Sequence, residues 1–492
     1  MSRSSLRVAL AAGCFVFTVW PRPAGAGDDE GFGSWLSQTL AHFEASPPAR
    51  AVQRELEQAR SALRESLEES PWTVEASAGQ AVLSPNPDEE EAMLFGRERA
   101  RSDLGGTVTL RTRSGWEASL DASTSYGRQQ LGGDSFGHQV QLTLAYDLTR
   151  GGTDGPAKTI ERINASRATR SLHGFRQRLV DLQVELQGLL TDVYVTECRL
   201  RRLEDLRGAV AETVETGKLL LDTKTISYKD YLNFVDLDNA FRRRIVGLES
   251  EQRALVERLE RWGPRVVAAT RELREQEPDC APDVSAVIDR ADSLDLARRR
   301  REEVAGGLPS VTAASAAVTT AKLDLHLERQ DQKPSVVVFL QTEVSRVPPV
   351  DRTLGSITAG MSFSWEVAGA RGDLAIQTDR KALLAADARR EEVLVDNVTR
   401  INTLIAENHS QKDVFAVIEK SLDTSRELLK VLDAERSIGL VDSLSYTNAV
   451  LNAVDAELEL LQRWAILEKN SFELELYVAY VDRSSYRPAN AQ

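Results

Sequence analysis

The side chains that most often perform catalysis or bind metals are scattered through this sequence. The histidines are His42, His138, His173, His326 and His409. No two of them have the spacing of a metal site, and neither a Gly-x-Ser-x-Gly motif nor a Gly-rich phosphate loop occurs. The abundant Asp and Glu residues are typical of the solvated faces of long helices. We therefore predict no catalytic residue, no metal site and no cofactor, which argues against an enzyme.

The carboxylates with the most distinctive setting lie beside two expected helix turns. Two charged stretches without Gly or Pro, 373–436 and 440–480, flank Gly439, a residue that adopts a tight turn at no steric cost. They predict two long antiparallel helices, the first spanning roughly 90 Å. The segment after Lys224 resembles the one after Gly439, at an offset of 439 − 224 = 215. It predicts a second turn of the same kind.

Four other segments change from helical spacing to strict alternation of apolar and polar residues. They are 116–126, 140–148, 336–344 and 357–367. Each is about as long as a strand that crosses a membrane, for which ~9–11 residues are needed, and aromatic residues lie at or near the strand ends. The edge of a soluble β-sandwich shows the same alternation, so the pattern alone leaves both interpretations open.

The N-terminal segment, the net charge and the cysteines bear on the cellular location and the partners of the protein. Residues 1–26 have the basic start, apolar core and small-residue cleavage site of a secretory signal. A lipoprotein signal ending at Cys14 is the less favoured alternative, because the apolar residues continue past Cys14 and leave only a short apolar segment before it. The net charge of -14 becomes about -14 - 3 = -17 without the three Arg of the signal, which excludes a general affinity for nucleic acid. Whether Cys198 and Cys280 form a bridge cannot be decided from sequence.

The order of these segments indicates a tandem repeat. Each half is expected to contain a helix, a strand hairpin, a Gly-rich turn and a pair of long helices. We expect a signal at 1–26, repeat 1 at 27–263, a linker at 264–310, repeat 2 at 311–480 and a tail at 481–492. Repeat 1 carries an insertion at 84–126, which leaves the number of strands per chain at four or six.

In this arrangement the chain resembles the TolC-type outer-membrane efflux and type I secretion channels. The most specific likeness is ERSIGLVDSLSYTNAVLNA at 435–453. The strand ends AYDLTRGG at 145–152 and SWEVAGARGD at 364–373, and the helix-to-strand junctions at Pro71 and Pro334, are similar as well. The resemblance covers nearly all of the chain after the signal, and the duplication carries more weight than any single motif.

The resemblance implies an α+β fold. A long, coiled-coil-like antiparallel α-helical barrel would lie in the periplasm, and amphipathic β-hairpins would contribute to a shared transmembrane β-barrel in the cell outer membrane. It also implies a homotrimer that contacts outer-membrane lipid, a periplasmic adaptor (membrane fusion) protein and an inner-membrane transporter. Such a trimer would be a passive conduit for efflux or for protein secretion. An exported coiled-coil scaffold without a channel is the alternative.

The resemblance also selects candidate residues. The gate candidates at the periplasmic turns are Tyr228, Asp230, Asn233, Gly439, Asp442, Ser445 and Asn448. The membrane-facing candidates are Trp116, Tyr126, Leu142, Leu144, Tyr146, Met361, Phe363 and Trp365. The family's inward Asp falls on Asp230 in the first half but on Ser445 in the second, so one carboxylate of the pattern is missing, although Asp442 is near. The alternative is that no gate exists and that Asp230 is an ordinary solvent-exposed helix residue.

Overall fold

The structure is a computed structural model of the whole chain. It describes residues 32–67, 72–81, 98–111, 116–129, 133–148, 156–275, 280, 284–332, 335–347, 352–364, 370–437 and 442–485. The expected signal segment, Gly439 and Trp365 lie outside these residues. The chain divides into two compact units: unit 1 comprises 1–56, 173–312 and 392–492, and unit 2 comprises 57–172 and 313–391.

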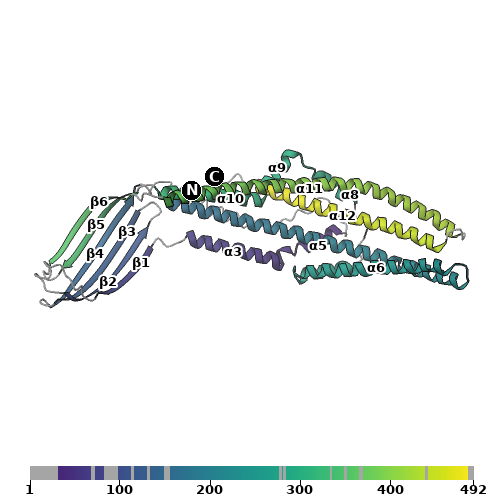
Figure 1. The fold of residues 1–492 in the computed structure, drawn as a ribbon, viewed down its shortest axis with the longest axis horizontal. Coiled ribbons are helices and arrows are strands. Elements are labelled where there is room, and N and C mark those ends of the chain that lie inside the picture. Colours follow the sequence, from purple (N-terminus) through teal and green to yellow (C-terminus); the bar gives the residue numbers. More distant parts are fainter. Residues whose placement is uncertain are drawn as a thin grey trace. The chain divides into compact units, whose positions relative to one another are not determined.

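Unit 2 contains an antiparallel sheet, which has six strands among the described residues and follows chain order in space (Figure 1). The strands are β1 (Trp72–Ala81), β2 (Glu98–Arg111), β3 (Trp116–Gln129), β4 (Gly133–Asp147), β5 (Ser335–Val347) and β6 (Arg352–Ser364). The strands expected from alternation are confirmed, and β1 and β2 precede them. The number of strands that the sequence left open is therefore six in the described part of the chain.

The register of the sheet explains why the alternation was so regular. Trp116 pairs with Tyr146, and Leu120 pairs with Leu142, which in turn pairs with Thr342. Paired residues of antiparallel strands point to the same face, so each apolar residue joins a row that crosses several strands. Gly360 allows one close approach on the opposite face, because a Cβ atom there would lie 2.6 Å from the Phe339 ring.

The helices beside the sheet in unit 2 belong to four elements of the described chain. They are α3 (Pro47–Leu67), α5 (Pro156–Asp222), α10 (Pro309–Asp331) and α11 (Ala370–Ser437). Each continues from one unit into the other along the chain. In unit 2, α5 is fastened to α10, because the buried Ser166 hydroxyl donates to the carbonyl of Ala316 at 2.7 Å and accepts from Thr320 at 3.1 Å.

Unit 1 is helical throughout its described residues. Besides parts of α3, α5, α10 and α11 it holds α2 (Phe32–Leu40), the short 3-10 helix η2 (Phe43–Ala45), α6 (Tyr228–Glu260), α7 (Pro264–Glu275), α8 (Val284–Ser293), α9 (Arg298–Gly307) and α12 (Ser443–Ser485). Ser46 caps the start of α3, since the Ala49 amide donates to the Ser46 hydroxyl at 3.4 Å. No helix among the described residues is long and apolar enough to span a membrane.

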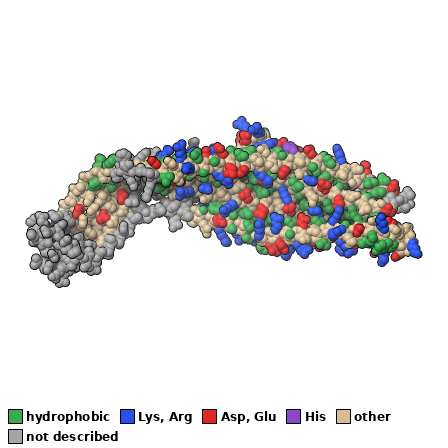
Figure 2. Space-filling model, viewed as in Figure 1, with side chains coloured by type: hydrophobic (Ala, Val, Ile, Leu, Met, Phe, Trp, Pro, Cys, Tyr) green, Lys and Arg blue, Asp and Glu red, His purple; other side chains and the backbone are tan. Residues whose placement is uncertain are grey.

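The packing of unit 1 follows a seam along each helix. In α6 the buried residues Phe234, Phe241, Leu248 and Leu255 recur at every seventh position, so this helix buries a single stripe. Phe241 and Leu248 pack with Leu203 of α5 in one buried cluster. Charged side chains of both signs are spread over the visible surface of the helices (Figure 2), as expected for helices in water.

Buried carboxylates in unit 1 are paired rather than isolated. Glu473 of α12 accepts two hydrogen bonds from Arg400 of α11, at 2.8 and 2.7 Å, and Glu468 accepts two from Arg290 of α8, at 2.9 and 3.1 Å. The Tyr477 hydroxyl also donates to Glu473 at 2.8 Å. Removing one partner would leave a buried charge unpaired, so these contacts fix how α8, α11 and α12 align.

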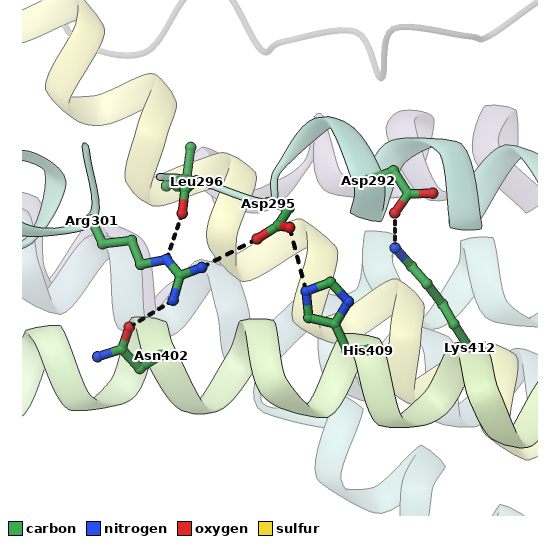
Figure 3. Close-up of polar contacts among 7 residues, drawn as sticks. All are labelled: Asp292, Asp295, Leu296, Arg301, Asn402, His409 and Lys412. Atoms are coloured by element: carbon green, nitrogen blue, oxygen red, sulfur yellow. Dashed lines mark hydrogen bonds and ion pairs between the residues drawn. The ribbon is translucent and has the colours of Figure 1, made fainter. Parts of the chain in front are cut away.

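The segment between α8 and α9 is held to α11 by a chain of polar contacts (Figure 3). Asp295 accepts a hydrogen bond from Arg301 at 3.2 Å and lies 3.4 Å from the His409 ring. One turn further along α11, Lys412 forms an ion pair with Asp292. The segment that the sequence marks as a linker is therefore attached to the long helix at several points.

A disulfide joins Cys198 of α5 to Cys280, which lies between α7 and α8. Cys198 is 1% exposed and belongs to a cluster that contains Tyr194 and Trp464. The bridge closes a loop with a sequence separation of 82 residues, which encloses all of α6 and α7. It therefore links the segment between α7 and α8, which belongs to the expected linker, covalently to α5.

We predict that replacing both cysteines, Cys198→Ala with Cys280→Ala, lowers the free energy of unfolding by about 4 kcal/mol, because the unfolded chain regains the entropy of a long loop. Thermal unfolding of the purified protein with and without reductant measures this effect. The double variant should be insensitive to reductant. Equal stability of the wild type and the double variant under oxidising conditions would contradict the assigned bridge.

Candidate functional site: two helix turns and the faces of the sheet

The first helix turn connects α5 to α6. Lys224 adopts a positive φ of 57°, the left-handed conformation that the sequence assigned to its counterpart Gly439. The amides of Thr225 and Ile226 both donate to the carbonyl of Leu220, at 2.8 and 3.3 Å, which satisfies a carbonyl at the end of α5. The turn thus ends the helix through backbone geometry and leaves most of its side chains exposed.

Asp230 belongs to the cap of the next helix. The Ser227 hydroxyl donates to Asp230 Oδ2 at 2.7 Å, the Ser227 amide donates to the same oxygen at 3.2 Å, and the Asp230 amide donates to the Ser227 hydroxyl at 3.2 Å. This reciprocal arrangement is a capping box. The hydrogen bonds from Ser227 hold the pKa of Asp230 below its ordinary value, so the carboxylate stays charged at neutral pH.

The second turn leads into α12, and it uses the same two residue types in the opposite order. The Ser445 amide donates to Asp442 Oδ1 at 2.8 Å, and the Ser445 hydroxyl donates to Asp442 Oδ2 at 2.8 Å. Partial burial acts to raise the pKa of Asp442, but the hydrogen bonds from Ser445 and neighbouring amides outweigh it and the pKa is lowered. Asp442 is thus also ionised at neutral pH.

The two turns correspond position by position. Ser227 matches Asp442 and Asp230 matches Ser445, because 442 − 227 and 445 − 230 both equal 215. Serine caps the helix and aspartate follows at the third helical position in one turn, whereas aspartate caps and serine follows in the other. The carboxylate that is missing at Ser445 is therefore present three residues earlier, and each turn keeps one carboxylate bonded to one serine.

The remaining turn candidates surround these caps. Asn233 and Asn448 are exposed, and Tyr228 is 65% exposed with its ring 6.3 Å from that of Tyr231. The close approach of α5 and α6 just below the first turn depends on Gly217. A Cβ atom on this residue would lie 2.6 Å from the ring of Phe234, which is buried.

The two helical hairpins are also tied to each other close to the turns. The hydroxyls of Thr213 in α5 and Thr447 in α12 lie 2.6 Å apart, and both side chains are buried. A little further along, Arg244 of α6 forms a 2.6 Å ion pair with Asp455 of α12. The sequence analysis did not select Thr213 or Thr447, because nothing local marks residues that are 234 positions apart as partners.

The six membrane-facing candidates with described side chains lie on one face of the sheet, and most of them are exposed. Trp116 is 52%, Leu142 41%, Met361 68% and Phe363 65% exposed. The other large exposed apolar residues in the same rows are Leu104, Leu120, Val140, Leu144, Val338, Leu340, Val344 and Ile357. The rings of Trp116 and Tyr146 lie 4.8 Å apart across two strands. Tyr126 lies in β3, but its side chain is outside the described part, as is Trp365.

The opposite face of the sheet is polar and partly covered. Thr107 donates to Asp121 at 2.6 Å, and Gln139 donates to Glu343 at 3.1 Å, so cross-strand hydrogen bonds connect the polar side chains. Asp121 and Glu343 are half-buried. The sheet therefore carries large exposed apolar side chains on one face, and cross-strand hydrogen bonds between polar side chains, some of them half-buried, on the other.

An antiparallel sheet with an outward apolar face, combined with paired long helices that end in matched turns, defines the fold of TolC-type outer-membrane channels. Comparison with solved structures supports this assignment of the fold. A membrane protein from Pseudomonas aeruginosa is similar with a TM-score of 0.67 and 14% identity, covering 94% of this chain and 97% of that one. The outer membrane protein VceC of Vibrio cholerae has a TM-score of 0.63 and 11% identity, covering 91% and 96%.

The Campylobacter jejuni CmeC outer membrane channel is similar as well, with a TM-score of 0.64 and 9% identity over 92% of this chain and 86% of the channel. Identities this low show a shared fold. No protein-family model and no curated protein matches the sequence. The expected fold, long helices with amphipathic antiparallel strands, is thereby confirmed.

We predict that Asp442→Ala weakens the start of α12 by about 1 kcal/mol, since two donors of Ser445 lose their acceptor. Asp442→Ser is the matched control, because a hydroxyl retains a capping acceptor. The pKa of Asp442 is lowered in the folded state, so its contribution is complete above about pH 4 and is lost as the pH falls below that value. Amide hydrogen exchange in the first turn of α12 measures both effects. Equal protection in Asp442→Ala and the wild type would contradict the cap.

Proposed function

We propose that this protein is an outer-membrane channel: a passive, trimeric conduit of a tripartite efflux or type I secretion system. The observation that carries the proposal is the exposed apolar face of the sheet. Contiguous exposed apolar surfaces mark membrane or protein contacts, and these strands, with 10 to 15 residues each, are long enough to cross a bilayer. The rods of unit 1 lie in the periplasm and the sheet lies in the outer membrane.

Three copies of the chain assemble because the sheet of one copy has edge strands whose unpaired backbone groups cannot form hydrogen bonds with lipid. Within the described residues, β1 and β6 pair on one side only. Backbone groups without partners cost several kcal/mol each in hydrocarbon, so strands of neighbouring copies close the sheet into one barrel. The rival function, an exported helical scaffold without a channel, provides no use for the outward apolar face.

The helices of unit 1 support assembly independently of the sheet. Val395, Val417 and Leu428 of α11 are 61%, 68% and 50% exposed, and their separations are multiples of eleven residues. Eleven residues make slightly more than three whole turns, so these three side chains lie on about the same side of the helix. On α6, Val246 is 59% exposed. We assign this side of α11 and the exposed Val246 position of α6 to contacts with neighbouring copies.

The turns form the periplasmic end of the conduit. Symmetry places three copies of Asp230 and of Asp442 around one axis, and rings of carboxylates favour cations. The exposed Tyr228, Asn233 and Asn448 surround these rings and contact a periplasmic adaptor. The chain has no motif for an energy source, so an inner-membrane transporter supplies the substrate.

Arginine substitution on the two faces of β4 tests the channel. We expect Leu142→Arg to weaken insertion by about 2–4 kcal/mol, because the charge would face hydrocarbon. Gln141→Arg, one residue away on the polar face, should insert normally. Heat-modifiable gel mobility after folding into lipid vesicles measures insertion, and single-channel recording of the wild type measures conduction. Equal behaviour of the two variants would count against a lipid-facing surface.

Engineered cysteines test the adaptor contact. We expect Tyr228→Cys and Asn448→Cys to form cross-links to a periplasmic adaptor in cells, because both positions are exposed at the turns. Arg299→Cys on α9 is the control, since its side chain is 92% exposed but lies away from the turns. Adducts at Arg299 alone, or at none of these positions with any adaptor, would contradict tip-to-tip docking.

A further inference from the structure

We propose that the hairpin of β1 and β2 is part of the barrel wall, so that each copy supplies six strands and the outer edge of β1 pairs with β6 of the next copy. The inference rests on the proposed function and specifies its interface. It gives the trimer a barrel of eighteen strands, three times the six that the described chain forms.

The first argument is that this hairpin continues the sheet without a break. β1 pairs with β2 through ten successive residues, from Trp72 opposite Leu110 to Ala81 opposite Arg101. β2 pairs with β3 from Leu104 opposite Thr124 to Arg111 opposite Glu117, and its only register shift lies near Glu98. A hairpin that folded away from the barrel would not need this register.

The second argument is that the apolar rows extend into the hairpin. Val74 of β1 pairs with Val108 of β2, which pairs with Leu120 of β3, so all three occupy the same face. Leu104 of β2 is on this face and 65% exposed, as much as Phe363 at the other side of the sheet. Water would disfavour such a residue on an isolated hairpin, whereas lipid around a barrel would not.

The third argument concerns closure. The six described strands alternate in direction, so β6 of one copy and β1 of the next run antiparallel, the pairing used in outer-membrane barrels. Eighteen strands spaced ~4.8 Å apart and tilted by ~40° have a circumference of about 110 Å. Unit 2 also contributes four described helical segments per copy, and a ring of twelve helices packed 8–10 Å apart measures roughly 100–120 Å. Twelve strands at the same tilt would reach only about 75 Å.

The consequence is a wide outer mouth. Barrel diameter grows roughly linearly with strand number, and barrels of 16–18 strands enclose an aqueous channel. A barrel of this width would therefore not be the constriction of the conduit.

Cross-linking between copies tests the pairing in the full-length protein in vesicles. The first variant combines Ala76→Cys in β1 with Ala359→Cys in β6. Parallel variants move the second cysteine along the same face of β6, to Thr353, Gly355, Ile357, Met361 or Phe363, so that the described length of the strand is scanned. The control combines Ala122→Cys in β3 with the same β6 positions. Ala122 shares a row with Ala76 through Gly106, but it is two strands further from the β1 edge. A short bismaleimide links thiols on adjacent strands and cannot bridge three strand spacings, about 14 Å.

We expect dimer and trimer ladders from at least one β1–β6 variant and none from the β3–β6 controls. Ladders from β3–β6 would overturn the inference, because the hairpin would then lie outside the ring. A heat-modifiable, conducting trimer that gives no ladder with any pair would overturn it as well, while leaving the proposed function intact. A protein that neither inserts into vesicles nor forms trimers would overturn the proposed function, and the inference with it.

Discussion

The backbone of a strand must find hydrogen-bond partners, and this constraint determines most of what this chain does. In water an unpaired edge is tolerable, whereas in hydrocarbon each unpaired group is costly. The sheet of unit 2 combines an apolar, exposed face with edges at β1 and β6 that pair on one side only within the described residues. These two properties conflict in a soluble monomer. They agree if several copies close one barrel in a membrane.

The helices satisfy a different requirement. The backbone groups of a helix form hydrogen bonds within the helix. The stability of these helices therefore depends on how their side chains are divided between buried seams and solvent-exposed faces. α6 buries one stripe against α5, while the carboxylates of Glu473 and Glu468 are paired with arginines where α8, α11 and α12 meet. The disulfide at Cys198 adds a covalent tie at the same level of unit 1. This part of the molecule is fixed by paired charge and covalent chemistry, and the turns are fixed by caps.

Much of the fold follows from periodicity, because the physical rule involved is local. Alternation located β3 to β6, and long stretches without Gly or Pro located α11 and α12. Alternation did not locate β1, which only the helix-to-strand junction at Pro71 indicated, because its residues between Trp72 and Ala81 are mostly small or weak strand formers, which reduces the contrast between its faces. Contacts between distant positions, such as Thr213 with Thr447 and the disulfide, depend on tertiary packing that local patterns do not encode.

The turns show why a motif can mislead when it is matched residue by residue. Comparison at Ser445 suggested that the second half had lost its carboxylate. The structure shows that a helix cap requires an acceptor and a partner three residues apart, and that serine and aspartate can exchange these positions. The charge of each turn is conserved by the exchange, although its position moves by about one helical turn. The helix cap and the charge of each turn therefore depend on the same pair of side chains, so a change at either position can alter both.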